Sequence, residues 1–250
     1  MSYIEEFLIQ DIILVLLTYT YVFMTILIPV QLKKRDKITK FTARKIVHLM
    51  AGLSVLSTPL YVWSWWSVVI AGSLTVLVLM SSKESKVKKL KELYDSIGEE
   101  AEEKVGFLQG PFHYCLSILI LVTIFVIFAP HQLYFPIAGI LIMIISDTLA
   151  SIVGKRWGTA QLKFSWTSPR TVQGSLTMFV SAFFLSLGSF YFFGVLNPVT
   201  QEVLTIELVF LYALITAILA TLIEVISPST WDDITVPIGT TFIIFLLTLI

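Results

Sequence analysis

Apolar stretches of near-spanning length recur along the whole 250-residue chain, and they constrain its fold more than any other feature. A transmembrane helix needs roughly 17–25 apolar residues to cross the ~30 Å hydrocarbon core of a bilayer. Stretches of that length, or close to it, lie at 7–30, 46–63, 65–80, 113–129, 132–153, 174–195, 203–226 and 234–250. We therefore expect an all-α polytopic integral membrane protein, a bundle of about eight transmembrane helices that forms one domain over residues 1–250.

The composition excludes several other classes of protein. Charged residues make up only 14% of the chain, whereas soluble domains carry about 25%. The 17 Lys and Arg balance the 17 Asp and Glu, so no overall basic field predicts a nucleic-acid partner. Cys115 is the single cysteine, which excludes an intramolecular disulfide and a cysteine metal cluster.

The second and third apolar stretches touch each other, so the number of spans depends on whether they form one helix or two. A single helix over residues 46–80 would be about 50 Å long at about 1.5 Å per residue, which is too long for one crossing. Pro59 favours a break between Ser57 and Trp66. We therefore expect two separate spans here.

The positive charges predict the orientation of the chain in the membrane. All Lys and Arg fall within 33–45, 83–104 and 155–170, which follow the first, third and fifth apolar stretches. With eight spans these segments share one side, and the positive-inside rule makes that side cytoplasmic, with both termini outside. Residues 84–105 repeat apolar side chains at three- and four-residue steps, which predicts a cytoplasmic amphipathic helix on the membrane surface.

Acidic residues near the predicted cytoplasmic ends of the fifth, seventh and eighth spans are the main candidates for chemistry, because charges near a bilayer are costly. They are Asp147, Glu224, Asp232 and Asp233. Such acids beside the basic segment 155–170 suit Mg²⁺ bound together with a polyphosphate. The structural alternatives are that Asp232 or Asp233 is a helix N-cap and that Glu224 is an interfacial acid.

Residues 146–158 predict a helix with one distinctive stripe. Asp147, Ser151, Gly154 and Gly158 follow at spacings of four, three and four, so they share a face. Glycines there would let a nucleotide approach the backbone, and the next helix, starting near Gly174, would offer free N–H groups to phosphate. The alternative is that the two glycines simply pack helices together.

The run RKIVH begins the second span. Arg44 and His48 are four residues apart and share a helix face, so they could hold a phosphate, or His48 could act as an acid or base. The alternative is a basic interfacial anchor with a hydrogen-bonded histidine. Asp11, near the outer face, is expected to be structural. The chain has no GxxxxGK[ST], GxSxG or HExxH motif, so phosphoryl chemistry would need another framework.

The segment Ser146–Ser175 resembles the nucleotide-binding signature shared by two enzyme groups: the polyprenol kinases (dolichol, phytol and farnesol kinases, with a CTP-dependent diacylglycerol kinase) and the CTP:phosphatidate cytidylyltransferases. The matching positions are Asp147, Ala150, Gly154, Gly158, Lys163 and Arg170-Thr171-Val172-Gln173-Gly174. Arg170 replaces the usual lysine and Gln173 the usual glutamate.

Two further segments resemble the kinase branch. RKIVH (44–48) resembles its amino-terminal motif, and Glu224 followed by DDITVP (232–237) resembles its carboxy-terminal motif, with Ile234 in place of asparagine. The His-Gly-Gly…Asp-Arg-x-Asp motif of the cytidylyltransferases is absent from the sequence.

The resemblance implies a membrane kinase that transfers the terminal phosphoryl group of CTP, or of another nucleoside triphosphate, to an isoprenoid alcohol in the bilayer (dolichol, geranylgeraniol or phytol-like). It implies Mg²⁺ held by Asp147, Asp232 and Asp233 together with Glu224, and an aspartate or His48 as the proton acceptor. The residues expected to bind nucleotide or phosphate are Arg44, Lys45, Gly154, Lys155, Arg156, Gly158, Lys163, Arg170, Thr171 and Gly174. The alternatives are a cytidylyltransferase that makes a CDP-lipid and a membrane transporter, although transporters usually place polar groups near the midplane.

Overall fold

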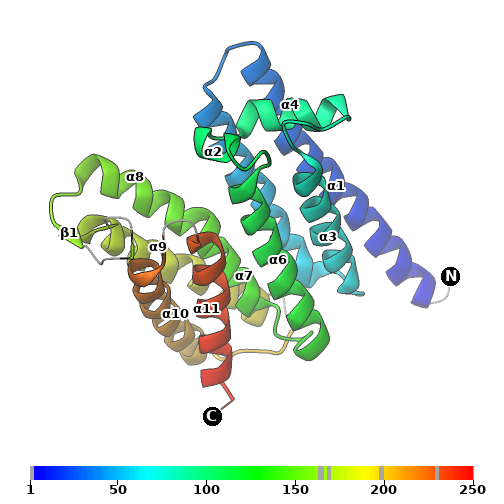
Figure 1. Cartoon of the computed structure of the whole chain (residues 1–250). Helices are drawn as coiled ribbons and strands as arrows, with labels where there is room; N and C mark the ends of the chain where they lie inside the picture. The colour runs from blue at the N-terminus through cyan, green and yellow to red at the C-terminus, as the bar shows by residue number, and fades with distance from the viewer. Residues whose placement is uncertain (1–2, 163–165, 168–169, 197–199, 229–230, 250) are drawn as a thin grey trace. The chain divides into compact units, whose positions relative to one another are not determined.

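The computed structural model describes residues 3–162, 166–167, 170–196, 200–228 and 231–249 (Figure 1). The chain divides into two compact units, Met1–Thr123 and Ile124–Ile250, and each is described by itself. The expectation of one transmembrane domain over the whole chain stays a prediction. Apart from two strands of two residues each, the regular structure in the described part of the chain is helical.

The first unit is built from α1 (Tyr3–Lys34), α2 (Lys40–Gly52), the 3₁₀ helix η1 (Leu53–Leu60), α3 (Trp65–Met80), α4 (Lys88–Ile97), α5 (Glu100–Glu103) and the first part of α6 (Gln109–Phe128). One buried cluster joins the ends of α1, α2 and α3 to α4. Its members are Val30, Ala43, Val78, Leu93, Tyr94, Ile97 and Leu108.

The predicted break between the second and third spans is confirmed. The helical segment that contains Pro59 ends at Leu60, and α3 begins at Trp65. Asp11 holds this turn from α1: its two carboxylate oxygens accept the backbone N–H groups of Val62 and Trp63, each at 2.9 Å. Asp11 is 2% exposed, so its predicted structural role is confirmed.

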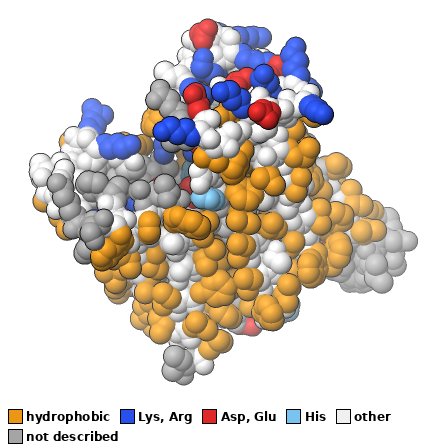
Figure 2. Space-filling view, in the orientation of Figure 1, with side chains coloured by type: hydrophobic (Ala, Val, Ile, Leu, Met, Phe, Trp, Pro, Cys, Tyr) orange, Lys and Arg blue, Asp and Glu red, His pale blue; other side chains and the backbone are white. Residues whose placement is uncertain are grey.

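The prediction of one continuous amphipathic helix over residues 84–105 is wrong. The structure has two helices, α4 and α5, separated at Gly98 and Glu99. Glu99 begins α5 in a reciprocal capping box with Glu102, which favours a new helix start over continuation of α4. Charged side chains gather at the end of this unit that carries α2 and α4, whereas its helix sides are hydrophobic (Figure 2).

The second unit begins with the last part of α6. Next come α7 (Tyr134–Leu141), the π-helix η2 (Ile142–Ser146) and α8 (Asp147–Trp157), which run on as one 24-residue helical segment. A small antiparallel ribbon follows, with β1 (Gln161–Leu162) paired to β2 (Arg170–Thr171). Then come α9 (Val172–Tyr191), the π-helix η3 (Phe192–Leu196), α10 (Ile206–Ile226) and α11 (Asp232–Leu247).

Small residues dominate the core of the second unit, which lets its helices approach closely. The buried cluster consists of Ile142, Ala150, Met178, Ala182, Ala217, Ala220 and Val236. The helix α9 packs against both α8 and α10, and α11 packs against α7 and α10. This arrangement brings the ends of α8, α10 and α11 to the ribbon.

Five helices of the described chain are long and apolar enough to cross a membrane: Leu8–Lys34, Gln109–Phe128, Tyr134–Trp157, Val172–Leu196 and Ile206–Ile226. The apolar helix Trp65–Met80 is shorter and has the bounds predicted for the third span. The protein is therefore an all-α membrane protein. Eight spans with both termini outside stay predictions.

Candidate functional site

An arginine joins two of the predicted acidic residues in the second unit. The Nε of Arg170, on β2, forms an ion pair with Glu224 Oε1 at the end of α10, at 3.1 Å. Its Nη2 donates to Asp232 Oδ2 in the first turn of α11, also at 3.1 Å. The side chains of Arg170, Glu224 and Asp232 are 16%, 4% and 19% exposed, so the ion pairs are largely shielded from water. Arg170 therefore contacts two acids that are each more than 50 residues away from it in the sequence.

Asp147, the first residue of α8, belongs to the same electrostatic group. Burial lowers the pKa of the Arg170 guanidinium, but nearby carboxylates, Asp147 among them, raise it above its ordinary value. Asp147 also acts electrostatically on Glu224. The ribbon, the end of α10 and the start of α11 therefore meet at one charged cluster, on which Asp147 acts from within the continuous helical segment 134–157. We call Asp147, Arg170, Glu224 and Asp232 the acid–arginine cluster. A π-helix precedes Asp147 directly, a distortion that is frequent at functional sites.

The glycine stripe of α8 lies against the start of α9. A Cβ on Gly154 would lie 2.8 Å from Thr171 Oγ1, and a Cβ on Gly158 would lie 2.5 Å from Thr171 Cγ2. Gly174 in turn faces the Ala150 carbonyl oxygen. The glycines therefore make the helix contact that was the structural alternative. Their predicted contact with a nucleotide stays a prediction.

The N-terminus of α9 has fewer free donors than the sequence led us to expect. The N-cap is Thr171, whose hydroxyl accepts the N–H of Gly174 at 3.1 Å. The N–H of Val172 donates to the carbonyl of Ala160 at 3.0 Å. Two of the first three N–H groups of this helix thus already have acceptors. A phosphate would have to be held mainly by side chains.

Four other residues of this unit were predicted for the site: Lys155, Arg156, Asp233 and Lys163. Lys155 and Arg156 are exposed in the last turn of α8, where the Arg156 guanidinium lies 5.0 Å from the ring of Trp157. Asp233 follows Asp232 in the first turn of α11, whose N-cap is Trp231, so the alternative of an aspartate N-cap is wrong. Lys163 lies outside the described residues.

The cluster offers hard oxygen donors to a cation. Glu224 Oε2 is buried and has no hydrogen-bond partner among the described residues. The described residues nevertheless contain no group of three or more His, Cys, Asp or Glu side chains arranged to hold a metal ion. Mg²⁺ is usually held by one or two carboxylates together with substrate phosphates and waters, not by a full protein cage. The donor set fits an ion that arrives with a nucleotide.

The RKIVH run lies in the first unit, where Arg44 is bound by acids. Its Nη1 donates to Glu102 Oε2 at 2.7 Å, and its Nε pairs with Glu99 Oε1 at 3.3 Å. Glu102 also accepts the N–H of Gly110, at the start of α6, at 2.8 Å. This buried carboxylate therefore ties α2, α5 and α6 together. Arg44 thus has a structural role between these helices, whereas the interfacial anchor and the phosphate binding predicted for it both stay predictions.

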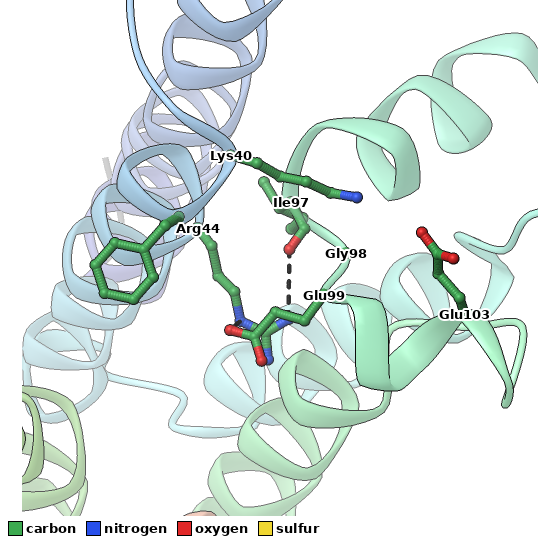
Figure 3. A pocket seen from close by; sticks show the side chains of 7 residues that line it. Lys40, Arg44, Ile97, Gly98, Glu99 and Glu103 are labelled. Carbon is green, nitrogen blue, oxygen red and sulfur yellow. Dashed lines mark hydrogen bonds and ion pairs between the residues drawn. The ribbon is translucent and has the colours of Figure 1, made fainter.

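A hollow of about 480 Å³ opens beside this arginine (Figure 3). Lys40 from α2 and Glu103 from α5 project toward it.

The other two predicted residues of the RKIVH run contact aromatic rings. Lys45 lies 5.9 Å from the ring of Phe41. The His48 ring packs against Tyr114 with centroids 4.3 Å apart. The catalytic role considered for His48 stays a prediction.

The role of Glu102 and the central position of Arg170 were not predicted from the sequence. The E-x-x-E spacing of Glu99 and Glu102 resembles a capping box, but glutamate is an unusual N-cap residue. Arg170 was expected to bind phosphate, whereas here both of its ion pairs are made with carboxylates. No local pattern indicates that a single basic side chain will bridge two distant acids.

Comparison with known proteins gives relatives of one kind. The chain is 30% identical over 220 residues to a probable chloroplastic phytol kinase 2 of Glycine max, covering 87% of this chain and 69% of the relative. It is 30% identical over 224 residues to a probable chloroplastic phytol kinase of Zea mays, with coverages of 87% and 70%. Phytol kinase 1 of Arabidopsis thaliana, also chloroplastic, is 26% identical over 216 residues, with coverages of 84% and 67%.

No protein-family model matches the chain, and no solved structure matches it. The relatives nevertheless cover more than four fifths of this chain. The resemblance drawn from the motifs is thereby confirmed: the chain belongs to the phytol kinase group of the polyprenol kinase family.

Proposed function

We propose that this chain is a membrane kinase that transfers the terminal phosphoryl group of a nucleoside triphosphate, CTP first among the candidates, to the hydroxyl of an isoprenoid alcohol such as phytol. The observation that carries the proposal is the acid–arginine cluster, which combines residues of α8, the ribbon, the end of α10 and the start of α11 in a chain related to phytol kinases. Phosphoryl transfer requires mainly positioning and charge neutralisation. A cluster of carboxylates with basic side chains nearby supports both.

In this proposal Asp147 and Asp232 would hold a magnesium ion that accompanies the nucleotide, with Asp233 as a neighbouring carboxylate. Magnesium would supply neutralisation of the charge on the phosphate oxygens. Arg170 orients Glu224 and Asp232, which would otherwise repel each other. Glu224 has its Oε1 paired to Arg170, and its buried Oε2, which has no hydrogen-bond partner among the described residues, would be a further oxygen donor to the ion.

Among the described residues of this unit, Lys155 and Arg156 are exposed, and we assign them to the phosphates of the nucleotide. The alcohol oxygen forms a bond to the terminal phosphorus, the bond from that phosphorus to the bridging oxygen breaks, and the nucleoside diphosphate leaves. The hydroxyl proton goes to an aspartate of the cluster.

The proposed topology has eight spans, with the cluster on the cytoplasmic side and both termini outside, since the basic segments follow the first, third and fifth spans. The alcohol would lie in the bilayer with its hydroxyl at the surface where the nucleotide arrives. Exposed apolar side chains on the spanning helices support contact with lipid.

The test is phosphoryl transfer by the purified protein in nanodiscs. Phytol, geranylgeraniol, dolichol and phosphatidate are offered as acceptors with γ-³²P- or α-³²P-labelled CTP, and then with γ-³²P-ATP. We expect γ-label, and no α-label, in the alcohol. Entry of α-label into lipid would instead support a cytidylyltransferase, and no label in any lipid would refute both enzymes. Asp147→Asn and Asp232→Asn should abolish transfer in folded protein, and full activity of both would remove the metal assignment.

A further inference from the structure

A side-chain clamp closes the turn between α8 and the ribbon. The backbone N–H of Thr159 donates to Gln173 Oε1 at 3.1 Å, and Gln173 Nε2 donates to Thr159 Oγ1 at 2.6 Å. Gln173 lies in the first turn of α9, 14 residues after Thr159. Its amide therefore uses its acceptor and one of its donors on a single residue of the turn.

The clamp is reinforced by the backbone on the same side. The N–H of Val172 donates to the carbonyl of Ala160 at 3.0 Å, and Gln161 pairs with Thr171 across the ribbon. The turn after α8 and the start of α9 are thus joined at three successive residues. Of these links, the Gln173 clamp is the one made by a side chain.

The clamp lies at the base of the ribbon that carries Arg170. Arg170 is three residues before Gln173, and it is paired across the ribbon with Leu162. Its guanidinium reaches Glu224 and Asp232 from this ribbon. Movement of the ribbon base would therefore move the arginine relative to its acidic partners.

The chemistry of the clamp does not require a charge. A glutamate at position 173 could accept both the N–H and the O–H of Thr159, because a threonine hydroxyl can turn to donate or to accept. Leucine has a similar size but offers neither a donor nor an acceptor. The family signature that this segment resembles has glutamate at the position of Gln173. In this geometry either residue can make the same two hydrogen bonds to Thr159.

We propose that Gln173 is a positioning residue of the kinase site: by holding Thr159 it fixes the ribbon that presents Arg170, and its hydrogen bonds, not its charge, are what the position requires. The effect on turnover rests on the proposed function. The effect on the ribbon does not, so the two can be measured separately.

The experiment compares Gln173→Leu, Gln173→Glu and the control Gln161→Leu in nanodiscs. Gln161 is an exposed glutamine of the same ribbon, and its side chain forms no hydrogen bond with the described residues. In Gln173→Leu we expect the KM for CTP to rise about tenfold, a factor that corresponds to roughly 1.4 kcal/mol, with kcat within about twofold of wild type. Gln173→Glu should restore KM, and Gln161→Leu should leave it unchanged.

Hydrogen exchange followed by mass spectrometry gives a readout that does not depend on activity. The peptide that contains Thr159 and Val172 should exchange about tenfold faster in Gln173→Leu than in wild type, and Gln173→Glu should restore the slow rate. Unchanged exchange and KM in Gln173→Leu would overturn the inference. So would failure of Gln173→Glu to rescue, or a loss confined to kcat. If wild type phosphorylates no alcohol, the proposed function fails while the exchange data still decide whether the clamp exists.

Discussion

Removal of the Arg170 charge should strongly destabilise the second unit. Arg170→Met keeps much of the side-chain length but leaves Glu224, whose side chain is 4% exposed, without its cation. Breaking a buried ion pair by removing one partner costs about 3–5 kcal/mol. Asp232 is 19% exposed, so water screens part of its loss and most of the cost falls on Glu224. For a chain of this size 1 kcal/mol corresponds to about 2–4 °C in Tm, so we expect a decrease of roughly 6–20 °C.

The matched test is to remove the stranded acid as well. Arg170→Met/Glu224→Gln leaves no buried unpaired charge at this position and should recover most of the lost stability, since a buried pair replaced as a whole is often neutral. Arg170→Met/Asp232→Asn should recover less, because Asp232 is the more exposed partner. The order of the two double variants follows directly from the exposed fractions of the acids.

Thermal unfolding in nanodiscs, followed by tryptophan fluorescence, measures these differences. If Arg170→Met melts within about 2 °C of wild type, the ion pairs carry little of the stability of this unit and the reasoning is wrong. If Arg170→Met/Glu224→Gln is no more stable than Arg170→Met, the cost does not come from the uncompensated carboxylate. Circular dichroism before heating serves as the control for correct folding.

Three further outcomes are expected. Gly158→Ala should destabilise the α8–α9 contact, because its Cβ would lie 2.5 Å from Thr171 Cγ2, whereas Gly188→Ala meets nothing within 4 Å and should be neutral or stabilising by up to about 1 kcal/mol; equal melting temperatures would contradict this. Asp11→Ala should cost about 3 kcal/mol or more in chemical denaturation, because two N–H groups of the turn lose a charged acceptor, and Asp11→Asn should cost less since it keeps one acceptor; a cost below about 1 kcal/mol for Asp11→Ala would argue against a structural role. Exposed tryptophans near the site should lie at the membrane interface. In single-tryptophan variants, lipids that carry a nitroxide near the head group should therefore quench the tryptophan fluorescence more than lipids that carry it near the end of the acyl chain, and the reverse order would place the tryptophans deeper in the bilayer. These tryptophans are Trp157, Trp166 and Trp231.

The amino-acid sequence alone determined the class of protein and most helix positions. Apolar length predicted α3 at Trp65–Met80 and the break around Pro59, because a helix has a fixed rise and a bilayer a fixed thickness. The motifs predicted the family, and the cost of charge near a bilayer singled out Asp147, Glu224, Asp232 and Asp233, whose functional roles stay predictions. Each of these inferences rests on local sequence or on one bulk property of the membrane.

Only the tertiary structure decided which partner each polar group has. Arg170 bridges Glu224 and Asp232 because the ribbon, the end of α10 and the start of α11 lie together. No local periodicity of the sequence predicts this arrangement. Likewise, the glycines of α8 contact Thr171, and the helix expected over 84–105 breaks where Glu99 and Glu102 cap each other. Hydrophobicity sets which segments leave water, but hydrogen bonds and ion pairs act over about 3 Å, so their partners are set only once the helices have packed.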